Sequence, residues 1–168
     1  MDENTSVLKL IRIFTPSIVF MMNGKVGVSS LTKDTSSAPK SWEFMHRIDK
    51  LNKDTALVAV RAAIGDKKKS PYYLDVIVSG IFECKNYEDD PVEKQVMEVN
   101  TISILFPYLR SIVTNITSSA QVEPFVLPII NTYEMSDTED DGEDTPHDDD
   151  PTTDDINKAI RSINKANK

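Results

Sequence analysis

The chain has 168 residues, of which 39% are apolar and 27% are charged, and its formal net charge is −8. A chain of this length can bury a conventional apolar core, so it needs neither a metal nor a disulfide to stay folded. Its single cysteine, Cys84, excludes a disulfide within the chain and favours a reducing compartment. We therefore expect a cytoplasmic location.

No targeting or membrane-spanning signal is evident. Residues 1–4 are acidic and polar, whereas a secretory signal opens with positive charge and continues with an apolar stretch. The longest apolar run, residues 102–113, contains polar residues and a proline, and it is shorter than the roughly 20 residues that span a bilayer. We expect a soluble protein that does not insert into membranes.

Negative charge is concentrated in one segment. Residues 136–155 hold 11 acidic residues and no basic one, whereas residues 1–135 hold 16 acidic against 15 basic residues. The acidic segment has nothing to bury and repels itself, which predicts a disordered linker. The chain therefore divides into a domain at 1–135, an acidic linker at 136–155 and a short basic amphipathic tail at 156–168.

The tail carries four basic residues and an apolar stripe. Ile156, Ala159, Ile160 and Ile163 follow the spacing of one helix face. A helix this short is marginal in water, so we expect it to order only against a surface. Two alternatives stay open, a frayed tail without a role and a docking element.

Four segments of the domain carry strand patterns. Residues 8–22 are rich in branched and aromatic residues but contain Pro16, which predicts two strand pieces with a kink or an edge there. Residues 42–48, 55–64 and 72–83 alternate with a period of two. In the last segment, one face mixes polar with bulky apolar residues, so we expect it to meet another subunit, a helix or a ligand.

From Ser103 onward the apolar period becomes helical. Ser103 is expected as the N-cap and Pro107 in the first turn, with the helix ending near residues 118–120. A shorter helical pattern precedes it at residues 92–99. Strands followed by a helix predict an α+β fold, in which a long helix packs on one face of a four-stranded antiparallel sheet.

A resemblance appears in the helix. Ile-Leu-Phe-Pro-Tyr-Leu-Arg at 104–110, followed by Leu-Pro-Ile-Ile-Asn at 127–131, resembles the signature of the SecB family of protein-export chaperones. Residues 10–15 and 80–82 resemble that family's first and fourth strands. The motif residues are Ile104, Leu105, Phe106, Pro107, Tyr108, Arg110, Leu127, Pro128 and Asn131. The resemblance implies an ATP-independent holdase, a dimer of dimers that holds unfolded or precursor chains in apolar grooves.

The resemblance also implies sites. The second strand lines the family's client groove, and the expected client-binding residues are Trp42, Phe44, His46, Val78 and Phe125. The alternative is that Trp42 and Phe44 are core residues. The expected oligomer interface is the mixed face of the fourth strand, with Tyr73, Asp75, Ile77 and Ile81. Clients are general or restricted to one partner such as an antitoxin, and the alternative function is a non-enzymatic adaptor that recognises one folded protein.

The sequence departs from the family at two places. Ser17 and Met21 stand where the family presents acidic residues to the SecA motor, and only Asp75 keeps an acid, which makes docking to SecA doubtful. The family's second helix is also missing, since the chain runs from residue 132 into the acidic linker. We hypothesise that the tail, residues 156–168, replaces that helix or competes with clients for the groove.

Signals for chemistry are weak. Cys84 and His46 have no nucleophile signature around them, and residues 24–27 lack the spacing of a phosphate loop. The acidic run begins like a calcium loop at Asp137 but has no Glu at its twelfth position, and one cysteine with two distant histidines cannot build a zinc site. A nearly neutral domain beside an acidic linker disfavours nucleic acid. We expect no enzyme, no cofactor and no metal.

Overall fold

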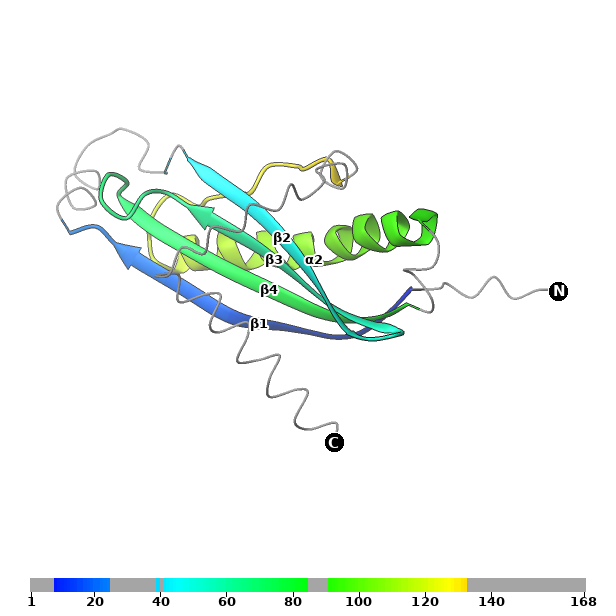
Figure 1. Cartoon of the computed structure of the whole chain (residues 1–168). Coiled ribbons are helices and arrows are strands. Elements are labelled where there is room, and N and C mark those ends of the chain that lie inside the picture. The colour runs from blue at the N-terminus through cyan, green and yellow to red at the C-terminus, as the bar shows by residue number, and fades with distance from the viewer. Residues whose placement is uncertain (1–7, 25–38, 40, 85–90, 133–168) are drawn as a thin grey trace.

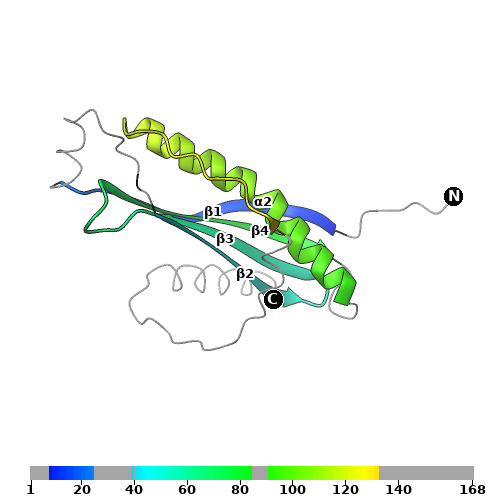
Figure 2. The same ribbon diagram turned by 90° about the horizontal axis from the view of Figure 1, so that it is seen from above.

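The computed structural model describes residues 8–24, 39, 41–84 and 91–132 (Figure 1). Its elements in chain order are β1 (Leu8–Met22), β2 (Trp42–Asn52), β3 (Thr55–Ile64), β4 (Tyr72–Cys84) and α2 (Pro91–Ser119). The strands form one antiparallel sheet in the order β1-β4-β3-β2, and α2 lies on one face of it (Figure 2). This arrangement confirms the predicted α+β fold. The linker and the tail lie outside the described residues.

β1 is one continuous strand rather than the two expected pieces. Its pairing with β4 shifts register between Leu10 and Arg12 and again between Phe14 and Ser17. Pro16 falls in the second shift, on a strand at the edge of the sheet. A proline has no N–H to donate, and an irregular edge position tolerates it because no ladder hydrogen bond is required there.

α2 begins at Pro91, so the expectation of an N-cap at Ser103 is wrong. Proline is favoured at the first helical position, where its missing N–H costs nothing. Ser103 lies inside the helix, and its hydroxyl donates to the carbonyl oxygen of Val99 at 2.8 Å. Pro107 is accommodated on an exposed side of the same helix. Core contacts on both sides of Ser103, from Met97 to Leu109, hold one uninterrupted helix.

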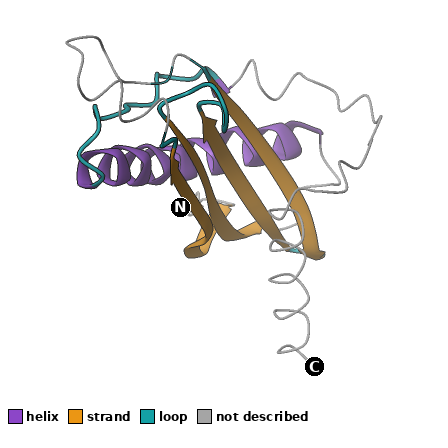
Figure 3. Cartoon of the chain, turned by 90° about the vertical axis from the view of Figure 1, so that its left-hand side faces the viewer, coloured by secondary structure: helices purple, strands orange, loops and turns teal. Residues whose placement is uncertain are grey.

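The core lies between the sheet and α2, which crosses behind the strands in Figure 3. The central strands and the helix contribute residues without exposed area: Val58, Val60, Val76, Val78, Ile102, Leu105, Leu109 and Val113. Residues 94–119 are long and apolar enough on average to cross a membrane. Their packing against the sheet accounts for that apolarity. Cys84 is also buried in this core.

Gly80 allows the helix to approach β4 closely. A Cβ atom at this position would lie 2.9 Å from Cδ2 of Leu105 and 2.6 Å from the ring of Phe82. Both distances are shorter than carbon atoms tolerate without movement, so the space beside Gly80 is filled by the core itself. The Gly-Ile-Phe at residues 80–82 thus has a packing reason in this fold.

Backbone conformation fixes the connection between β3 and β4. Gly65 has a φ of +79°, and a Cβ atom there would lie 2.4 Å from the carbonyl oxygen of Tyr72. The carboxylate of Asp66 accepts the backbone N–H groups of Lys68 and Lys69 at 2.8 and 2.9 Å. These hydrogen bonds, the one from Lys68 first, lower the pKa of Asp66. The conformation of this loop is therefore set by Gly65 and by the hydrogen bonds to Asp66.

We predict that Gly65→Ala lowers the free energy of unfolding by about 1–3 kcal/mol, because the left-handed backbone is strained for alanine and the added atom collides with a carbonyl. Gly24→Ala is the matched control, since nothing lies within 4 Å of its added atom. Equilibrium unfolding in urea measures both changes. Equal losses for the two variants would contradict the assigned role of Gly65.

Candidate functional site

The helix-facing row of β2 forms the margin of the core. Trp42, Phe44 and Ile48 are half-buried and pack against the core cluster, and His46 in the same row is half-buried too. The ring of Phe44 meets that of Phe106 on α2 edge-on, with 5.7 Å between centroids. Each of these side chains therefore keeps part of its surface accessible while its base is fixed by the core.

Phe125 and Val78, the other two expected client-binding residues, differ in their exposure. Phe125 follows α2, is half-buried and packs against the core cluster. Val78 has no exposed area and lies in the core between the sheet and α2. An unfolded chain cannot reach it on this structure, so we remove Val78 from the candidate surface. Phe125 stays in it.

Residues 121–132, which we call the strap, run back along α2 (Figure 2). The chain reverses at Gln121, whose φ is 57°. The N–H of Val122 then donates to the carbonyl oxygen of Thr117 at 3.3 Å, which satisfies an otherwise unpaired carbonyl at the helix end. The helix thus ends in a turn that directs the strap along its side.

Side chains of α2 hold the strap by its backbone. The N–H of Phe125 donates to the hydroxyl oxygen of Thr117 at 3.0 Å, and the hydroxyl of Thr114 lies 3.2 Å from the carbonyl oxygen of Phe125. Nη2 of Arg110 donates to the carbonyl oxygen of Pro128 at 2.9 Å. Positions 110, 114 and 117 share one side of a helix. The strap is therefore attached along its length.

The strap presents apolar side chains in both directions. Val122 and Leu127 are buried, and Phe125 and Ile130 pack partly against the core. Val126 is 61% exposed and Ile129 is 90% exposed. Large apolar side chains this exposed on a fixed backbone are typical of a binding surface. We call Val126, Ile129, Phe125 and the half-buried row of β2 the strap surface.

Arg110 joins the three elements of this surface. Its guanidinium lies 5.1 Å from the centroid of the Phe106 ring, and that ring contacts Phe44 of β2. Its Nη2 holds the strap, while its Nε is buried without a hydrogen-bond partner. The four-residue spacing of Phe106 and Arg110 in the motif places both on one side of the helix, which gives this part of the motif a structural reason.

The remaining motif residues have separate roles. Leu105 is buried in the core and Ile104 packs beside it, whereas Pro107 is exposed and Tyr108 is 49% exposed on the solvent side of α2. In the strap, Leu127 is buried and anchors the segment, while Pro128 and Asn131 are exposed. The motif therefore encodes helix packing and strap attachment together.

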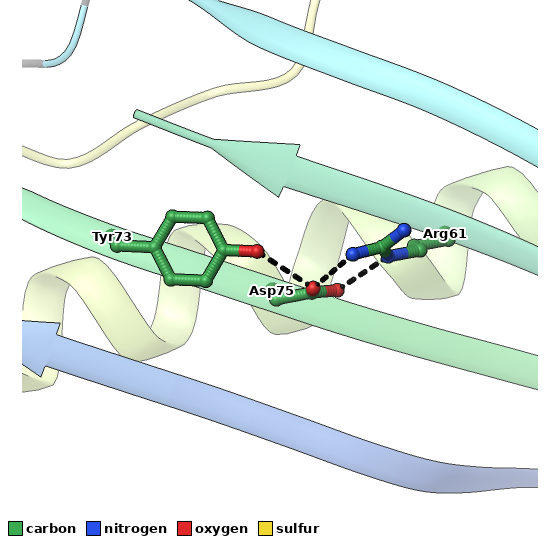
Figure 4. Close-up of polar contacts among 3 residues, drawn as sticks. All are labelled: Arg61, Tyr73 and Asp75. Carbon is green, nitrogen blue, oxygen red and sulfur yellow. Dashed lines mark hydrogen bonds and ion pairs between the residues drawn. The ribbon is translucent and has the colours of Figure 1, made fainter. Parts of the chain in front are cut away.

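The outer face, meaning the sheet face opposite α2, carries the expected interface residues. Tyr73 and Ile81 are half-buried, whereas Asp75 and Ile77 are buried. Figure 4 shows Asp75 between two partners on this face. Nε of Arg61 donates to Oδ1 of Asp75 at 2.9 Å with an ion pair to Oδ2 beside it, and the hydroxyl of Tyr73 donates to Oδ2 at 2.9 Å. The role of these residues between subunits stays a prediction.

The charges of Arg61 and Asp75 neutralise each other within this cluster. Burial, and then the hydrogen bond to Asp75, raises the pKa of Tyr73 to about 12, so the phenol remains a donor at neutral pH. The resulting stability is present below the ordinary tyrosine pKa and is lost as the pH rises towards 12. The Asp75 side chain is only 4% exposed, so its charge is neutralised by Arg61 and is not accessible to a partner protein.

The exposed apolar side chains along the edge strand β1 were not predicted from the sequence. β1 has one strand neighbour in the described sheet, and five of its large side chains are 37–53% exposed: Leu10, Ile11, Ile18, Met21 and Met22. The signal was present, because apolar residues occupy both alternating phases of this segment. Within the described ranges, no three His, Cys, Asp or Glu side chains are grouped so that they could hold a metal ion.

We predict that Arg61→Leu lowers the free energy of unfolding by about 3–5 kcal/mol, because it leaves Asp75 buried without its cation. Adding Asp75→Leu should recover most of that loss. Lys9→Ala is the control, because its ion pair with Glu83 is long and exposed and contributes at most about 1 kcal/mol. Urea unfolding tests all three, and a double variant no better than Arg61→Leu would refute the explanation.

Removing Arg110 should free the strap without unfolding the helix. We expect Arg110→Ala to accelerate amide hydrogen exchange at residues 121–132 and to cost about 1–2 kcal/mol of stability, since one charged hydrogen bond and one ring contact are lost. Ser111→Ala, on an exposed side of the same helix, should change neither. Exchange at the strap that is the same in both variants would show that Arg110 does not hold it.

Comparison with known proteins agrees with this arrangement. The family described as preprotein translocase subunit SecB matches residues 8–139. An uncharacterised protein of Methanocaldococcus jannaschii is 38% identical over 92 residues, which is 53% of this chain and 59% of that protein. The protein-export protein SecB of Saccharophagus degradans is 27% identical over 121 residues, or 71% of each chain, and that of Azoarcus sp. is 34% identical over 77 residues, 46% of this chain and 50% of that protein.

A solved structure shares the fold. The SecB-like chaperone Rv1957 of Mycobacterium tuberculosis, solved with a ChAD peptide from the HigA1 antitoxin, superposes with a TM-score of 0.57 at 17% identity. The match covers 73% of this chain and 90% of the other. The family match spans the whole described fold, from the first strand to the strap, and the chain belongs to the SecB family.

Proposed function

We propose that this chain is an ATP-independent holdase, which binds unfolded or precursor polypeptides on the strap surface and keeps them from aggregating. The observation that carries the proposal is the exposure of Val126 and Ile129, at 61% and 90%, on a strap that α2 holds at several points. Membership of a family of export proteins supports the same reading.

The surface suits a ligand without fixed sequence. Burying one Val or Ile side chain contributes about 1.5–3 kcal/mol, and this contribution depends on apolar area rather than on the identity of the partner. Val126 and Ile129 together would give only weak binding. The half-exposed row of β2 lies on the same side of the sheet and adds area, so that a longer extended segment gains affinity from several contacts.

Backbone hydrogen bonds offer a second contribution. β1 and β2 are the edge strands of the described sheet. An edge strand presents unpaired N–H and C=O groups that any extended peptide can satisfy. We propose that clients bind in an extended form, with side chains on the strap surface and backbone along an edge.

The client range is part of the proposal. The Mycobacterium tuberculosis protein of the same fold was solved with an antitoxin peptide, which supports a short polypeptide segment as the ligand class.

We propose assembly as a dimer of dimers in the cytoplasm, as expected for the family. Docking to SecA through the outer face is not part of it, because Arg61 and Tyr73 already engage Asp75.

The proposal is tested by suppression of aggregation. We expect the wild-type chain to suppress aggregation of several unrelated denatured proteins, and Val126→Asp with Ile129→Asp to weaken client affinity at least about ten-fold, because two apolar contacts are replaced by charges. The control is Val96→Asp, which alters an apolar side chain that is 46% exposed on α2 outside the strap.

The outcomes separate the alternatives. Suppression of every client indicates a general holdase, and suppression of one indicates a dedicated chaperone. If no denatured client is retained, the holdase proposal is wrong and the adaptor function takes its place. Equal loss in the strap variant and in Val96→Asp would place binding elsewhere on the chain.

A further inference from the structure

The outer face has an apolar centre. Leu57 and Ile77 are each 1% exposed and Ala59 is 5% exposed, although all three point away from α2. Strand register places half-buried Ile81 opposite Leu57, and Met45, 45% exposed, opposite Arg61. An antiparallel sheet with one solvated face is ordinarily polar on that face. A sheet that is apolar on both faces requires a cover on each.

Three basic residues on this face already have acidic partners. Arg61 is bound to Asp75, Arg47 donates to Asp49 at 2.8 Å, and Lys9 lies 3.7 Å from Glu83. A strongly charged partner would therefore find few free opposite charges here, whereas an apolar stripe would find area to bury. α2 and the strap both lie on the other side of the sheet and leave this face to another occupant (Figure 2).

We propose that the tail, residues 156–168, docks on the outer face of its own sheet as a short helix. Its apolar stripe is Ile156, Ala159, Ile160 and Ile163. At 100° per residue these four positions fall within about 100° of arc, and the basic residues Lys158, Arg161, Lys165 and Lys168 fall on the opposite side. Docking by the stripe thus buries apolar area and leaves every basic group in solvent, so the face needs no free acids to receive it.

The dimensions agree. Thirteen helical residues extend about 20 Å at 1.5 Å per residue. Four strands spaced about 4.8 Å apart present a face roughly 14 Å across between the outermost strands. A helix of this length therefore covers the width of the sheet, from β1 to β2, without projecting far beyond it.

Because the tail is tethered to the domain, weak contacts with the outer face are sufficient for it to dock. Residues 133–155 separate the end of the strap from Ile156, and a flexible chain of this length spans about 25–30 Å. A segment attached in this way has an effective concentration of about 1 mM at its site. The helix is marginal when free and gains its order from the sheet, so folding and docking occur together.

This inference goes beyond the proposed holdase and does not depend on it. It takes the place of the predicted oligomer interface at Tyr73, Asp75, Ile77 and Ile81, because the tail and a second subunit cannot cover the same face. The strap surface and the outer face lie on opposite sides of the sheet, so the tail covers one without blocking the other. Docking there also takes the place of the hypothesis that the tail replaces the family's second helix or competes with clients, because the buried apolar centre of the outer face has no described element packed over it.

Hydrogen exchange of the full chain tests the docking without any client. We expect amides in 156–168 to exchange at least about ten-fold more slowly than in a synthetic peptide of the same sequence. Met45→Glu on the face and Ile160→Glu on the stripe should each return exchange to the rate of the peptide. Ser162→Glu, off the stripe, and Val126→Glu, on the strap, should preserve the protection.

Three results would overturn the proposal. Exchange at the peptide rate in the unaltered chain would show that the tail is undocked. Protection lost in Val126→Glu but kept in Met45→Glu would place the tail on the strap surface. Protection that decreases on dilution would show docking between two copies. Ile160→Glu lies outside the domain, so its result is independent of any effect on domain folding.

Discussion

The packing of α2 against β3 and β4 is the constraint on which the rest of the structure depends. Leu105 reaches β4 because Gly80 has no side chain, and the buried stripe of the helix closes the core. The strap is attached to Arg110, Thr114 and Thr117 of that helix. A shift of the helix would therefore displace the strap. Exposed apolar residues can be held in place only because the helix beneath them is fixed.

This dependence divides the sheet into two faces with different chemistry. On the helix side, the core and the strap surface are continuous, since Phe44 contacts Phe106 and Phe106 contacts Arg110. On the outer face, ion pairs neutralise one another around an apolar centre. A client-binding surface and a face with three ion pairs thus share the same strands, and their side chains alternate along each strand.

Alternation along the strands predicted the sheet, and the helical apolar period from Ser103 onward predicted the helix that covers it. The periodic signals are local, and the resemblance at 104–110 agreed with them. The start of α2 was misplaced, because Ser103 looked like a cap while the stronger signal, proline at the first position, stood at Pro91. Interactions between residues far apart in the sequence could not be predicted. Arg61 and Asp75 are on different strands, and Val78 could be recognised as core only once the helix was placed over it.

The exposure of individual strap residues could not be predicted from the sequence either. Its Leu-Pro sequence resembled a family motif, but its exposed residues could not be told from its buried ones until Arg110 and Thr117 were seen to hold the backbone. Leu127 and Ile129 are two residues apart and similar in character, yet one is buried and the other is 90% exposed. Composition cannot separate them, because attachment to the helix decides which side chain faces outward.

The most direct measurement is methyl NMR of the chain with an unfolded client added in steps. We expect the methyl signals of Val126 and Ile129 to shift and broaden together as the client is added, while those of Leu57 and Ile77 on the outer face stay in place. Shifts confined to the outer face, or none on the strap at saturating client, would contradict the claim that the strap surface holds unfolded polypeptide.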